Sequence, residues 1–77
     1  MTIKILAFGQ ISEITGTSDW TVENVQDTDH LRVLLEEQYP SLIGLKYSLA
    51  VNKEVTHQNT LLNQGDTIAL LPPFSGG

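Results

Sequence analysis

The sequence predicts an α+β fold of the β-grasp class, in which a mixed sheet curls over one main helix. Two β-type segments open the chain, an amphipathic helical segment follows, and β-type segments close it. The expected order is therefore strand, strand, helix, strand, strand. A chain of 77 residues also has room for only one hydrophobic core. In this class the last strand lies beside the first, in parallel.

The first strand is expected over Thr2 to Phe8, because β-branched and apolar residues alternate there between two faces. One face carries Ile3, Ile5 and Ala7, and the other carries Lys4, Leu6 and Phe8. Gly9 ends the strand.

A short helical turn is expected over residues 10–15, with Gly16 as its left-handed stop. The chain then returns as a second strand over residues 20–25. These two strands are predicted to form a hairpin with a long connection.

The main helix is expected to begin at Asp27 or Thr28, both of which are good N-caps. Its apolar positions recur with helical spacing. They are Leu31, Leu34, Leu35 and Tyr39. Pro40 is expected to stop the helix, because proline cannot continue the backbone hydrogen bonds.

Two further strands are expected over residues 48–51 and 67–71. Asn52 and Lys53 are expected to form a tight turn from the first of them into Glu54 and Val55, since asparagine tolerates the positive φ of a hairpin. A second turn is expected over residues 64–66. In the last strand the inward residues are Ile68 and Leu70, and the outward residues are Ala69 and Leu71.

Face parity predicts an apolar patch on the side of the sheet away from the helix. Its members are Leu6, Phe8, Ala69 and Leu71, with Leu62 at its border. A small domain rarely exposes such a patch without a partner. The alternative is that the loop over residues 42–44, or Trp20, covers it.

Composition excludes several classes of protein. The chain has no cysteine, which rules out disulfides and thiolate chemistry of its own and favours a reducing, cytoplasmic setting. The net charge is −5 and the four Lys and Arg residues are scattered, so no nucleic-acid surface is expected. The negative charge favours a basic partner or simple solubility. No membrane span, metal site or bound cofactor is expected, and the domain is predicted not to be an enzyme by itself.

The most unusual segment is the C-terminal one. We divide the chain into a domain over residues 1–71 and a flexible tail over residues 72–77, which reads Pro72-Pro73-Phe74-Ser75-Gly76-Gly77. The prolines prevent the sheet from continuing, and the glycines make the end thin enough for a narrow channel. A frayed terminus with no role is the alternative.

Three segments resemble the small subunits of molybdopterin synthase, which are ubiquitin-like sulfur carriers. The segments are AFGQISEITG (residues 7–16), AVN (residues 50–52) and LNQGDTIALLPPFSGG (residues 62–77). Gly-Asp before the last strand, followed by Pro-Pro-x-x-Gly-Gly, is the most specific part. The resemblance covers essentially the whole chain.

The resemblance implies a route for sulfur through the terminal carboxylate of Gly77. A ubiquitin-activating-type enzyme adenylates this carboxylate with ATP, and sulfur from a persulfide donor then gives a thiocarboxylate. The tail enters the large subunit of the synthase, where the sulfur attacks cyclic pyranopterin monophosphate to build the dithiolene. The implied complex is a heterotetramer of two large and two small subunits.

Matched position by position, the resemblance implies that residues 72–77 are the tail. It also implies that Phe8, Leu62 and Leu71 contact the partner proteins. Two positions depart from the family pattern. Phe74 stands where a small aliphatic residue is usual, and Ser12 stands where arginine is common.

Other functions remain open. A sulfur carrier for thiazole synthesis shares the Gly-Gly end, but it usually lacks the Pro-Pro pair. A carrier for tRNA thiolation is generally longer. A ubiquitin-like modifier would end as an isopeptide on lysines, and a passive interaction module would not need its last two glycines.

Overall fold

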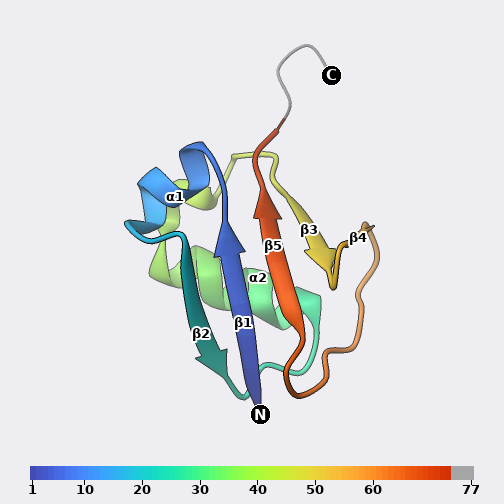
Figure 1. Ribbon diagram of the computed structural model, residues 1–77. Helices are drawn as coiled ribbons and strands as arrows, with labels where there is room; N and C mark the ends of the chain where they lie inside the picture. Colours follow the sequence, from blue (N-terminus) through green and yellow to red (C-terminus); the bar gives the residue numbers. More distant parts are fainter. Residues whose placement is uncertain (74–77) are drawn as a thin grey trace.

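One main helix lies across one face of a five-stranded mixed sheet (Figure 1). The computed structural model describes residues 1–73. The elements are β1 (Thr2–Ala7), α1 (Gln10–Thr15), β2 (Asp19–Glu23), α2 (Thr28–Gln38), the 3-10 helix η1 (Pro40–Leu42), β3 (Ser48–Val51), β4 (Glu54–Thr56) and β5 (Thr67–Leu71). The strand order is β2-β1-β5-β3-β4, and the sheet is antiparallel except for β1 and β5. The β-grasp prediction is confirmed.

The two central strands, β1 and β5, supply the middle of the core. Ile3 and Ile5 on β1, and Ile68 and Leu70 on β5, are fully buried against the helix side of the sheet. In the parallel register Ile5 lies opposite Ile68 and Ala7 opposite Leu70. The inward sets predicted for both strands are confirmed.

Helix α2 begins and ends where local chemistry requires. Asp27 is the N-cap, and its carboxylate accepts a hydrogen bond from the backbone N–H of His30 at 2.9 Å. The helix ends at Gln38 because the residue before Pro40 is kept out of the helical region. Tyr39 accordingly has φ −129° and ψ 81°.

The predicted apolar stripe of α2 is partly wrong. Leu31 and Leu35 are fully buried, whereas Leu34 is 36% exposed. Neighbouring helical residues point about 100° apart, so Leu34 lies at the margin of the face centred near Leu35. The buried hydroxyl-bearing residue Thr28 shares the inward face instead.

The segment into which the Asn52-Lys53 turn leads forms a strand of its own, so three strands follow the helix where the expected order had two. Asn52 (φ 50°) and Lys53 (φ 76°) make a two-residue turn, which returns the chain as the three-residue strand β4 at the edge of the sheet. Positive φ at both positions is the hairpin geometry that matches strand twist. The expected turn is confirmed, and the short strand that it starts completes the sheet.

Candidate functional site

The open face of the sheet carries the predicted apolar patch, at the end from which β5 leaves the domain. Phe8 follows β1 and is 47% exposed. Leu6, Ala69 and Leu71 are partly exposed, while their neighbours Ala7 and Leu70 are buried. Leu6 lies directly opposite Ala69 in the parallel register of β1 and β5. Alternation therefore places these four apolar side chains on one surface, as expected.

Neither of the two covers considered for this patch lies over it. Trp20 is opposite Ile5 in the β1–β2 register, so it belongs to the helix-covered face. There its ring meets Tyr39 edge to face, with centroids 6.1 Å apart. Leu42 is fully buried in the core. Within residues 1–73, the patch is open to a partner.

Leu62 is not at the border of the patch, and that expectation is wrong. It is 5% exposed and belongs to the core. Its backbone N–H donates to the carbonyl of Gln26 at 2.8 Å, which holds this loop against the start of α2. Leu61, the next residue back, is 75% exposed.

The start of the predicted tail is anchored beside the patch. Pro72 is partly buried and Pro73 is exposed. Gly9 (φ 55°) approaches the Pro72 ring closely. Ser12 donates from its hydroxyl to the carbonyl of Gly9 at 2.7 Å. Phe74, Ser75, Gly76 and Gly77 lie outside the described residues.

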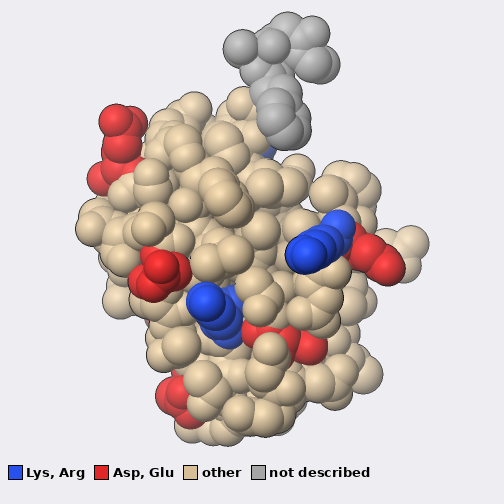
Figure 2. Space-filling model, in the orientation of Figure 1, with Lys and Arg blue, Asp and Glu red and all other residues tan. Residues whose placement is uncertain are grey.

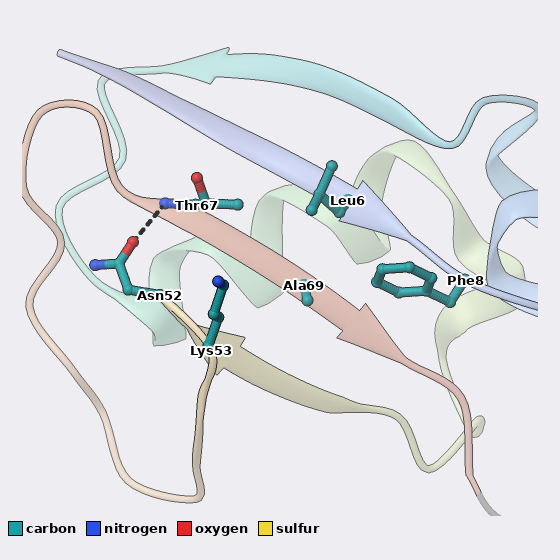
Figure 3. Close-up of a pocket in the computed structure, with 6 residues that line it drawn as sticks. All are labelled: Leu6, Phe8, Asn52, Lys53, Thr67 and Ala69. Carbon is teal, nitrogen blue, oxygen red and sulfur yellow. Dashed lines mark hydrogen bonds between the residues drawn. The ribbon is translucent and has the colours of Figure 1, made fainter.

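A hollow of about 400 Å³ lies on the patch, and three of the four patch residues help to line it (Figure 3). It is lined by Leu6, Phe8, Asn52, Lys53, Thr67 and Ala69. Lys53 and Phe8 stand toward its two ends, with Ala69 between them. Sequence reasoning missed Lys53, although the turn that bears it was predicted. Its place beside β5 depends on strand order, which alternation alone does not reveal.

Hydrogen bonds fix the polar end of this hollow. The side-chain carbonyl of Asn52 accepts from the backbone N–H of Thr67 at 3.0 Å, and its amide donates to Asp66 at 3.0 Å. The Asn52 amide, with help from the backbone N–H of Asn63, holds the pKa of the Asp66 carboxyl below its usual value. The β3–β4 turn is thereby tied to the start of β5.

Residues 1–73 contain no group of three or more potential metal-ligating side chains. They also contain no helix long and apolar enough to cross a membrane. What the site presents is a binding surface beside the strand that leads to the C-terminal segment.

Comparison with known proteins adds to this geometry. The profile of the ThiS family matches residues 5–77. A molybdopterin synthase sulfur carrier subunit of Caenorhabditis briggsae is 34% identical over 100% of this chain and 99% of its own length.

Two solved structures are also similar. One is a complex of subunits 1 and 2 of the molybdopterin-converting factor from Helicobacter pylori, with TM-score 0.76, 30% identity and 100% coverage of both chains. The other is the small archaeal modifier protein 1 from Methanosarcina acetivorans, with TM-score 0.83, covering 99% of this chain and 96% of that one. At 22% identity, this second likeness shows the fold alone.

Proposed function

The chain belongs to the ThiS family, and we propose that it is the sulfur-carrier subunit of a molybdopterin synthase. The observation that carries the proposal is the parallel pairing of β5 with β1. This pairing places Phe8 and Leu71 on one open apolar surface and directs the chain from that surface into Pro72 and the Gly-Gly end. A docking surface next to a thin reactive end is what a carrier subunit needs.

The proposed chemistry takes place at the terminal carboxylate of Gly77. A carboxylate is anionic at neutral pH and a poor electrophile, so it must first be activated. A ubiquitin-activating-type partner transfers the adenylyl group of ATP to it and releases pyrophosphate. The outer sulfur of a persulfide donor then displaces AMP to give an acyl disulfide, and a thiol of the donor system cleaves its S–S bond, which releases the thiocarboxylate and leaves a disulfide on the donor side. ATP is used by the partner, and the carrier itself holds no cofactor.

The thiocarboxylate is a soft nucleophile held on the carrier. The proposed acceptor is cyclic pyranopterin monophosphate in the large subunit, where the transferred sulfur becomes part of the dithiolene. The H. pylori complex of subunits 1 and 2 supports a large-subunit partner. We propose a heterotetramer with two carriers, acting in the cytoplasm as the cysteine-free sequence suggests.

The proposal is tested by measuring the intact mass of the chain after incubation with its adenylating enzyme, ATP and a sulfur source. The expected result is a mass gain equal to sulfur replacing oxygen, localised by fragmentation to Gly77. No gain, with the enzyme active on a control carrier, would overturn the carrier function. Conjugates linking Gly77 to lysines of other proteins would favour the modifier instead.

A further inference from the structure

The hollow at the apolar patch is lined by a basic residue, although the chain as a whole is acidic. The net charge is −5, yet Lys53 lines this hollow and Lys4 lies on the same face, opposite Thr67. Figure 2 shows two groups of basic side chains on this face, each with an acidic group close beside it, and further acidic groups toward the margin. Among residues 1–73, neither ammonium group has a carboxylate within 4.0 Å.

The backbone at Lys53 has a conformation that its residue type does not favour. Its φ of 76° is a conformation that glycine adopts freely and other residues adopt at a cost. Asn-Gly is the preferred pair for a turn of this type, but here the pair is Asn52-Lys53. The hydrogen bonds that Asn52 accepts from the Thr67 N–H and donates to Asp66 then hold the base of the lysine beside the hollow.

The composition of the hollow favours a protein side chain over a small molecule. Small-molecule sites combine apolar walls with several convergent polar groups. Here the walls are Leu6, Phe8 and Ala69, both ends of the Asn52 amide are already engaged, and Thr67 adds a single hydroxyl. The Lys53 ammonium is the remaining charged group at the rim. An apolar side chain with a carboxylate beside it matches this arrangement.

We propose that the synthase large subunit places an apolar side chain in this hollow and an adjacent aspartate or glutamate against Lys53. The inference rests on the proposed function, because it names the chemistry by which that partner is recognised. Electrostatic pairs at an interface act mainly on association rate and on the choice of partner. Lys53 is thus a specificity-determining residue of the docking surface.

The test measures the affinity of the carrier for the large subunit from the same organism, at low and high salt. Lys53→Glu is expected to weaken binding about tenfold at low salt, with a smaller effect at high salt. Lys53→Gly should also weaken binding while leaving the free energy of unfolding equal or higher, since it relieves the positive φ. Gln38→Glu, an exposed change on α2, is the charge control and should bind like wild type.

A second readout identifies the proposed contact directly. Carbodiimide joins amines to carboxylates without a spacer, so it is expected to link Lys53 to an aspartate or glutamate of the large subunit. Lys53→Glu binding within about twofold of wild type at low salt, or a mapped complex without this cross-link, would overturn the inference. If wild type itself failed to bind the large subunit, the proposed function would fall, and this inference with it.

Discussion

Gly9 and Pro72 lie so close together that a β-carbon on Gly9 would stand 3.3 Å from Cγ of the Pro72 ring. Gly9 also has φ 55° and ψ −132°, a conformation that residues with a side chain rarely adopt. The end of β1 and the exit of β5 therefore meet at a point where only glycine fits without adjustment.

We expect Gly9→Ala to lower the free energy of unfolding by about 1–3 kcal/mol, from backbone strain and crowding against Pro72. Chemical denaturation measures this loss. Gly16→Ala is the control for a positive φ without crowding, because Gly16 has φ 77° and nothing within 4 Å of its added β-carbon. A loss at Gly9 no larger than at Gly16 would show that contact with Pro72 contributes nothing.

Charge on the open face should prevent docking. We expect Phe8→Asp and Leu71→Asp each to weaken binding to the large subunit at least tenfold, because a desolvated carboxylate would face an apolar surface. Titration calorimetry measures the affinity, and circular dichroism checks that each variant folds. Val33→Asp, on the exposed side of α2, is the control. Unchanged affinity in both folded variants would mean that this face is not the interface.

Strand alternation and helix-end signals in the sequence predicted most of the fold and the apolar part of the site. Strict alternation in β1 and β5 was enough to place Phe8 and Leu71 on the face away from α2, because successive side chains of a strand point to opposite sides. Asp27 and Pro40 marked the helix ends through capping and the missing proline N–H.

The remaining features depend on contacts between distant segments. Leu61 and Leu62 are identical in type, yet only Leu62, whose backbone N–H donates to the carbonyl of Gln26, enters the core. Lys53 reaches the hollow only because β3 pairs with β5. Neither relation leaves a periodic signal in the sequence.

Alkaline pH should destabilise the fold through Tyr47. Burial and the hydrogen bond that its hydroxyl donates to Glu36 raise the pKa of Tyr47 to about 12, although the Arg32 guanidinium lies 4.8 Å from the ring centroid. The folded state then holds this proton more tightly than the unfolded state, where the pKa is about 10. The stabilisation is complete below about pH 10 and is lost as pH rises through about 12.

We therefore expect Tyr47→Phe to flatten the decline in unfolding free energy between those two pH values. Denaturation at a series of pH values measures it, and the ultraviolet absorbance of tyrosinate follows the proton directly. Tyr39→Phe serves as the control for the other tyrosine. An equally steep decline in the Tyr47→Phe protein would assign the alkaline transition to other groups.

Changes at the terminal carboxylate of Gly77 test the proposed sulfur transfer most directly. One residue added after Gly77 converts its carboxylate into an amide, which cannot be adenylated, and moves the new carboxylate onto a different residue. Gly77→Ala keeps the carboxylate but adds a methyl group to an end proposed to enter a narrow channel. We expect the extended chain to lose sulfur transfer completely and Gly77→Ala to lose most of it. Thiocarboxylate formation by intact mass, and dithiolene formation by the assembled synthase, measure the two steps.

Stability should not change in either variant, because the core is built from residues between Ile3 and Leu70. A residue added before Met1 is the matched control. It adds comparable mass at the end of the sheet where β5 begins, whereas the proposed tail leaves from the other end. This variant should form the thiocarboxylate at the wild-type rate. Normal sulfur transfer by the chain extended after Gly77 would contradict the carrier mechanism, since no reactive carboxylate would remain on Gly77.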